Sequence, residues 1–126
     1  FTGDTLFAMG CGRLFEGDAA TMWASLCKLM SLDDETVIYC GHEYTAANAD
    51  FALSVDPDND ALLRRVAAVR DLRSAGQPTV PTMLALEQLT NPFLRASDPS
   101  IRAHLGMADA DDVDVFTEIR LRKDNF

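Results

Sequence analysis

The sequence predicts an α/β fold in which a strand-bearing layer is followed by a small all-helical domain. The run Thr36 to Cys40 is short, apolar and β-branched, as buried strands are. Gly41 and His42 follow it at once, and from Thr45 onward the pattern is nearly continuous helix. We therefore expect one domain over 1–44 and a second over 45–126.

Composition limits the size of the core and the classes of partner. The chain has 126 residues, 48% of them hydrophobic, and a net charge of -9. That is enough for a globular core, and the acidic balance argues against nucleic acid and anionic membranes as partners. We find no membrane span and no signal peptide. Because the chain begins at Phe1 with what looks like the end of a strand, we expect a piece of a longer protein.

Cysteine usage indicates a reducing compartment. The three cysteines, Cys11, Cys27 and Cys40, are odd in number and lack C-x-x-C spacing. We expect buried thiols without disulfides and a cytoplasmic protein.

The first half should contain two helices around the strand. Asp18 is a good N-cap, and apolar residues at helical spacing predict a helix to about Leu32. After the strand, Thr45 is expected to cap a second helix that ends before Pro57.

A third helix is predicted over 60–75 and should end at Gly76. Its apolar stripe should face the core and its arginines should point outward. The predicted stripe is Leu62, Leu63, Val66, Val69 and Leu72, and the arginines are Arg64, Arg65, Arg70 and Arg73.

The remaining chain should alternate short helices with breaks. Two prolines make 77–82 an extended connection, after which Thr82 should cap a helix that runs to Leu89. Further helices are expected over 100–105 and 111–123, and the last of these ends in basic residues.

His42 is the first candidate for chemistry, because the carboxyl ends of strands are where α/β sheets usually carry their sites. Asp4 sits at a similar strand end, although an Asp after Gly is also an ordinary turn former. Together they would supply only part of a metal site, since zinc takes three or four protein ligands. His104 has no carboxylate neighbour in the sequence and is predicted to be a surface or packing residue.

Two other interpretations of these residues are a cysteine nucleophile and a purely structural role for the basic helix end. Cys40 stands two residues before His42, but a thiol nucleophile needs hydrogen-bond reach to its base and a third orienting group, so a buried strand cysteine is the simpler interpretation. The basic end of the last helix could merely complement the helix dipole. Adding Arg13 and Tyr44 favours a pocket for a carboxylate-bearing ligand.

Several motifs together resemble glyoxalase II, the hydroxyacylglutathione hydrolases of the metallo-β-lactamase superfamily. They occur in the family order and cover nearly the whole chain. The motifs are GDTLF at 3–7, CGRLFEG at 11–17, YCGHEYT at 39–45, TVPT at 79–82, TNPFLR at 90–95 and RLRKDNF at 120–126.

The resemblance implies the C-terminal part of a metallo-β-lactamase αββα sandwich followed by a helical domain that binds glutathione. It implies two divalent metal ions, zinc with iron or manganese as alternatives. The implied reaction is hydrolysis of the thioester of an S-(2-hydroxyacyl)glutathione, such as S-lactoylglutathione, by a metal-activated water.

The resemblance also assigns roles to residues. Asp4 would bridge the two metals and serve catalysis, and His42 would complete the shell of one metal. Arg13, Phe15 and Tyr44 stand at substrate positions, and Phe15 replaces a tyrosine that many members carry. The substrate positions at the end of the chain are Arg120 and Lys123, which match a basic pair for the glycine carboxylate of glutathione.

The departure from the family is large, because its His-x-His-x-Asp-His motif would lie upstream of Phe1. We therefore expect the missing N-terminal half to be a partner and the isolated chain to be inactive. Two non-enzymatic alternatives stay open: a module that binds glutathione conjugates, and a structural or interaction domain.

Overall fold

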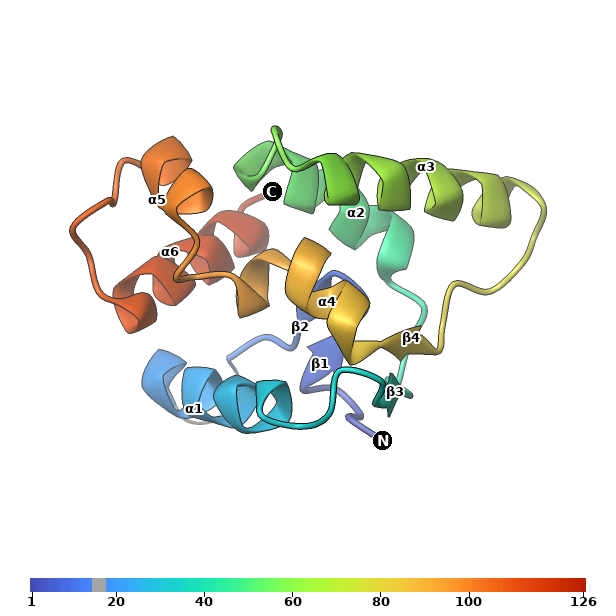
Figure 1. The fold of residues 1–126 in the computed structure, drawn as a ribbon, viewed down its shortest axis with the longest axis horizontal. Helices are drawn as coiled ribbons and strands as arrows, with labels where there is room; N and C mark the ends of the chain where they lie inside the picture. Colours follow the sequence, from blue (N-terminus) through green and yellow to red (C-terminus); the bar gives the residue numbers. More distant parts are fainter. Residues whose placement is uncertain (15–17) are drawn as a thin grey trace.

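The computed structural model describes residues 1–14 and 18–126, and within them it is mostly helical (Figure 1). The strands are β1 (Leu6–Phe7), β2 (Gly10–Cys11), β3 (Val37–Ile38) and β4 (Thr82–Met83). The helices are α1 (Ala19–Met30), α2 (Thr45–Val55), α3 (Asp60–Ser74), α4 (Leu84–Thr90), α5 (Pro99–Leu105) and α6 (Asp112–Asp124), with a 3-10 turn, η1 (Pro92–Leu94), between α4 and α5.

The strands form two small antiparallel pairs rather than one sheet. In the first, β1 and β2 make a tight hairpin in which Leu6 faces Cys11. In the second, β3 pairs with β4, with Val37 opposite Met83. An isolated parallel bridge joins Gly3 to Cys40. The strand expected over 36–40 is thus present but reduced to Val37–Ile38 and this bridge.

Most helix starts follow local capping chemistry. Asp18 accepts a hydrogen bond from Thr21 N, and Asn59, Asp98 and Asp111 cap α3, α5 and α6 in the same way. Two predicted caps are wrong. Thr45 is the first residue of α2, and Thr82 belongs to β4, where its hydroxyl donates to Glu87 instead of capping α4.

Within residues 1–14 and 18–126, the buried hydrophobic residues gather in two clusters. The larger joins the hairpin and α1 to η1, α5 and α6, and includes Phe51, Phe93 and Phe116. The smaller lies between α2 and α3 and receives Met9 from the hairpin turn. Figure 1 shows β1 and β2 near the centre of the molecule with helices on several sides. The hairpin therefore links both clusters.

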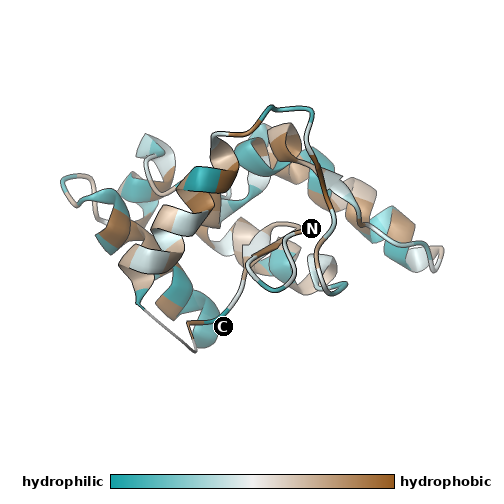
Figure 2. Ribbon diagram, turned by 90° about the horizontal axis from the view of Figure 1, so that it is seen from below, coloured by the Kyte–Doolittle hydropathy of each residue, from teal (hydrophilic) through white to brown (hydrophobic). Residues whose placement is uncertain are grey.

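The orientation predicted for α3 is partly wrong. Leu62, Val66 and Val69 are buried as expected, but Leu63 and Leu72 are 46% and 40% exposed. Arg65 was expected to point outward and is instead 7% exposed, because its guanidinium pairs with the buried Glu87 carboxylate. Figure 2 shows hydrophilic and hydrophobic residues intermixed around the helices.

The cysteines are free, as expected, but only one is buried. Cys11 is buried, Cys40 is half-buried and Cys27 is exposed on α1. The prediction of buried thiols is therefore wrong for Cys27. Among the described residues, none of the helices is both long enough and apolar enough to cross a membrane.

Candidate functional site

Backbone pairing brings Asp4 and His42 together. Thr2 N donates to Tyr39 O at 3.0 Å, and Gly41 N donates to Gly3 O at 2.8 Å. The two segments therefore run side by side, and each presents a polar residue just past the bridge. His42 Nε2 lies 3.4 Å from Asp4 Oδ1, and both side chains are largely exposed. Two residues 38 positions apart in the sequence thus share one exposed corner.

Two glycines make room for Asp4. A Cβ at Gly41 would lie 2.7 Å from Asp4 Oδ1, and a Cβ at Gly12 would lie 2.0 Å from Asp4 O. Neither position can take a side chain unless Asp4 moves. The glycines of the two motifs therefore act through close approach to the same residue.

An aromatic group supports the histidine. The ring of Tyr44 stacks on His42 with centroids 5.1 Å apart, and Phe7 meets Tyr44 edge to face at 5.1 Å. Phe7 itself is 6.2 Å from the imidazole. Because Phe7 belongs to β1, the hairpin contacts both sides of the Asp4–His42 corner.

A cavity of about 600 Å³ opens beside this corner. Asp4, His42, Phe7 and Tyr44 line it. The lining also carries three cations, which come from the loop after β2 and from α6. These are Arg13, Arg120 and Lys123. A volume of this size falls in the range of small-molecule sites.

The cations are close enough to affect one another. Desolvation holds the pKa of Lys123 below its ordinary value of 10.5, and the charges of Arg120 and Arg13 lower it further. In the described part of the chain, neither Arg13 nor Lys123 forms an ion pair. These cations therefore favour an anionic group in the cavity.

Arg120 differs from the other two cations because its guanidinium is largely engaged. The residue is 4% exposed, Nη1 donates to Cys11 O at 2.8 Å, and Nη2 lies 2.9 Å from Asp124 Oδ1. The guanidinium also lies 5.0 Å from the Phe93 ring centroid. Its position fits a residue that shapes the cavity wall, and its substrate contact stays a prediction.

The geometry does not support Cys40 as a thiol nucleophile with His42 as its base. Cys40 Sγ lies 3.4 Å from the backbone oxygen of His42, not from the imidazole. Burial raises the pKa of Cys11, which lines the cavity, to about 12, so that thiol is protonated at neutral pH. His104 is exposed and contacts Ser54 O at 3.0 Å, as expected for a surface residue.

The donors at the corner suit a divalent metal but are few. A carboxylate and an imidazole are ordinary ligands of zinc, and both are accessible here. Among residues 1–14 and 18–126, His, Cys, Asp and Glu nowhere form a group of three or more that could hold an ion. Phe15, predicted to meet substrate, lies outside the described residues.

Phe7 and Asn48 are among the cavity residues that sequence reasoning missed. Phe7 lines the cavity and belongs to the GDTLF motif. Consecutive residues of a strand point to opposite faces, so if Leu6 faces the core, Phe7 is expected to face the site. Asn48 also lines the cavity, and its position one helical turn after Tyr44 places both on one face of α2.

Comparisons with known proteins identify relatives of this chain. The family model for the hydroxyacylglutathione hydrolase C-terminus matches residues 43–126. Curated proteins called hydroxyacylglutathione hydrolase match the whole chain, at 64% identity in Rhizobium meliloti, 63% in Maricaulis maris and 60% in Ruegeria pomeroyi. The chain covers 49% of each, so it spans about half the length of these relatives. The chain therefore belongs to the hydroxyacylglutathione hydrolase family.

Proposed function

We propose that this chain supplies the glutathione-binding wall and two metal ligands of a thioester hydrolase. The substrate is an S-(2-hydroxyacyl)glutathione, such as S-lactoylglutathione. Water adds to the thioester carbonyl and the C–S bond breaks, which yields the 2-hydroxy acid and glutathione. The observation that carries the proposal is the convergence of Asp4 and His42, 3.4 Å apart, in the lining of a cavity that Arg13, Arg120 and Lys123 also line.

Asp4 and His42 would hold two divalent metal ions together with ligands from the preceding part of a longer protein. Zinc fits these donors, and iron and manganese are alternatives. When bound, such metals lower the pKa of water and act as Lewis acids on a carbonyl. Asp4 would be available to such metals because its side chain is largely exposed.

The cations that line the cavity would bind the glycine carboxylate of glutathione. Arg13 and Lys123 lack ion-pair partners in the described residues, and Arg binds carboxylates through two parallel hydrogen bonds. Tyr44 lines the same cavity and stacks on His42, which suits contact with the peptide.

The preceding half, with the remaining metal ligands, would complete a metallo-β-lactamase αββα layer against residues 1–44. The exposed apolar side chains near β3 support such a partner: Val37 and Tyr39 are 47% and 49% exposed. The free cysteines suit the reducing environment of the cytoplasm, which we propose as the location.

The test uses a joined enzyme, in which the part of the Rhizobium meliloti relative that precedes the matched region is fused to this chain. We expect the zinc-loaded joined enzyme to hydrolyse S-lactoylglutathione, measured by release of glutathione thiol. The isolated chain should give no turnover above the uncatalysed rate. An inactive joined enzyme that folds and binds zinc would refute the proposal.

A binding role without catalysis is the second candidate, favoured by the three cations that line the cavity within this chain alone. Calorimetric titration of the isolated chain with S-methylglutathione tests it. Absence of heat at millimolar ligand would discard the binding module. A third candidate, an interaction domain, predicts self-association through the apolar side chains near β3, and a monomer on size-exclusion chromatography would argue against it.

A further inference from the structure

The hairpin that borders the site has an unusual turn. Ala8 and Met9 connect β1 to β2, and Met9 has φ 55, in the left-handed region that non-glycine residues rarely adopt. Such a residue persists only where its surroundings hold it in place. The two-residue strands provide little support of their own.

Side chains from the helical part bind the polar backbone atoms of this turn. Glu87 Oε1 accepts a hydrogen bond from Met9 N at 2.8 Å, and Asn48 Nδ2 donates to Ala8 O at 3.1 Å. Asn91 Nδ2 donates to both flanking carbonyls, Phe7 O at 3.2 Å and Gly10 O at 3.0 Å. The turn is therefore fixed by residues about 40 to 84 positions away in sequence.

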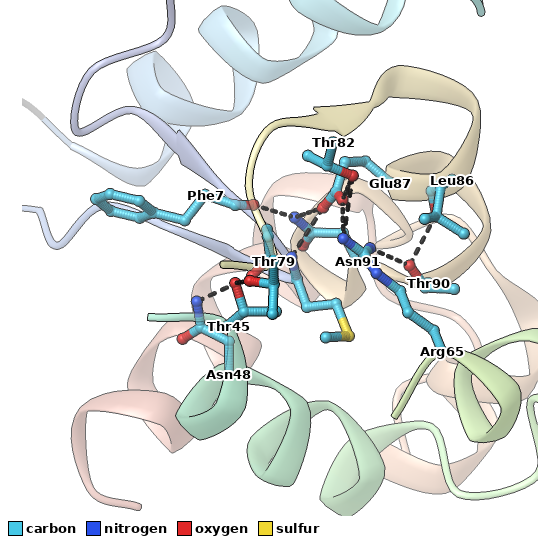
Figure 3. A network of polar contacts seen from close by, with 12 residues as sticks. Phe7, Thr45, Asn48, Arg65, Thr79, Thr82, Leu86, Glu87, Thr90 and Asn91 are labelled. Carbon is cyan, nitrogen blue, oxygen red and sulfur yellow. Dashed lines mark hydrogen bonds and ion pairs between the residues drawn. The ribbon is translucent and has the colours of Figure 1, made fainter. Parts of the chain in front are cut away.

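Glu87 and Asn91 are themselves held in a buried network (Figure 3). Both are 0% exposed, and Asn91 Nδ2 lies 3.1 Å from Glu87 Oε1. Arg65 Nη2 lies 2.5 Å from Glu87 Oε2, and Thr82 Oγ1 donates to the same oxygen at 2.8 Å. Burying an ion pair gives little or no net stability compared with apolar side chains, so stability alone does not account for a carboxylate at this place.

The hairpin connects the Ala8–Met9 turn to the Asp4–His42 corner. Gly12, directly after β2, donates its N–H to Thr5 O at 3.1 Å and packs against Asp4 O. Phe7, at the other end of the turn, contacts His42 and Tyr44. A shift of the turn would therefore move Asp4 through backbone contacts and His42 through its aromatic neighbours.

We propose that Glu87 and Asn91 are positioning residues that set the Asp4–His42 geometry by fixing the Ala8–Met9 turn. The expected change in kcat rests on the proposed function, whereas the expected change in the hairpin geometry does not. Arg65 provides a natural control. It contacts Glu87, Thr82 and Thr90 in the same network and, among the described residues, forms no hydrogen bond with the hairpin.

The experiment compares Glu87→Leu, Glu87→Gln and Arg65→Met in the joined enzyme. Glu87→Leu removes the acceptor for Met9 N, whereas Glu87→Gln retains a carbonyl oxygen there. We expect Glu87→Leu to lower kcat by about 10- to 100-fold and to reduce bound zinc, as loss of residues that orient metal ligands does. Glu87→Gln should recover most of kcat, and Arg65→Met should lower Tm without a comparable loss of kcat per folded molecule.

Amide hydrogen exchange provides a readout independent of catalysis. In Glu87→Leu the amides of Met9 and Gly12 should exchange at least about 10-fold faster, while the amide of Ile119 in the core of α6 keeps its rate. Arg65→Met should leave the Met9 and Gly12 amides protected. This measurement decides the inference even if the joined enzyme proves inactive, in which case only the proposed function fails.

A second variant covers the case in which Glu87→Leu does not fold. Asn91→Ser keeps a hydroxyl that can cap Phe93 N but cannot reach Phe7 O and Gly10 O, so it should give the same kinetic and exchange changes. The inference is overturned if the hairpin amides stay protected in the folded variants, or if Arg65→Met reproduces the effects of Glu87→Leu on kcat and exchange.

Discussion

Two polar clusters lie on either side of the β1–β2 hairpin, and they differ in where their hydrogen bonds go. In the buried cluster around Glu87, the carboxylate is met by Arg65, Thr82, Asn91 and the backbone of Met9. In the exposed cluster around the cavity, the Asp4 carboxylate pairs with the His42 imidazole, and both side chains are largely exposed. Arg13 and Lys123 form no ion pair among the described residues.

The buried cluster therefore serves folding, and the exposed cluster is available for recognition. A buried charge must be matched within the protein, because desolvation without a partner is very costly. Charges that remain exposed and gathered around a cavity are free to meet a ligand or metal instead. We therefore expect substitutions in the first cluster to lower stability, with a loss of kcat only where a contact to the hairpin turn is removed. Substitutions in the second should change function at nearly constant stability.

The largest expected effect is the loss of a partner from the buried pair. Arg65→Met leaves the Glu87 carboxylate without its cation, and removal of one member of a buried ion pair typically costs about 3–5 kcal/mol. Denaturant unfolding measures this loss. Arg70→Met is the matched control, since Arg70 is exposed and its contact with Asp50 is 3.5 Å, so the expected loss is below about 1 kcal/mol. Equal losses in both variants would contradict the distinction.

Asp4→Asn should lower activity strongly and leave stability nearly unchanged, the opposite of Arg65→Met. The residue is exposed, so the free energy of unfolding should change by no more than about 0.5 kcal/mol. Hydrolysis by the joined enzyme should fall by more than about 100-fold, beyond the effect typical of residues that merely orient a metal ligand. Asp58→Asn, another exposed carboxylate, should leave both quantities unchanged. Retained zinc content and activity in Asp4→Asn would remove Asp4 from the metal site.

Lys123→Met should raise KM by about 10-fold with little change in kcat. A lysine that binds a distant carboxylate contributes equally to the ground state and the transition state, and a half-buried charged contact has a moderate effect. Arg122→Met is the control, because Arg122 lies on α6 beside Lys123 but pairs with Glu118 at 2.9 Å. A fall in kcat instead of a rise in KM would place Lys123 nearer to the reacting bond.

Much of the fold could be predicted because the signals were local. The caps at Asp18 and Asn59 and the apolar spacing of the helices depend on neighbours in sequence. Arg65 could not be placed this way. Its helical position resembles that of the exposed arginines, and only Glu87, Thr82 and Thr90, brought near by tertiary packing, decide that it is buried.

The site shows the same limit. The strand-end positions of Asp4 and His42 indicated a shared corner, and the structure brings these residues together. Sequence spacing did not reveal Phe7 or Asn48 as cavity residues, nor that Arg120 is largely engaged with Cys11 O and Asp124. These depend on how the hairpin packs against α2 and α6, for which local patterns carry no information.

The smallest expected effect is a pH dependence set by Lys123, whose pKa is lowered by desolvation and then by Arg120 and Arg13. Binding of S-methylglutathione should weaken as pH rises through this lowered pKa, because the ammonium loses its charge. Lys123→Arg should abolish the weakening, since arginine stays charged. For folding the sign is reversed. The unfolded chain holds this proton more tightly, so the free energy of unfolding rises with pH between the folded pKa and 10.5, and Lys123→Met should lose that rise. Affinity for S-methylglutathione and the free energy of unfolding should therefore change in opposite directions over this pH range. If they instead rise or fall together, deprotonation of Lys123 cannot account for both, and the lysine does not face the ligand carboxylate.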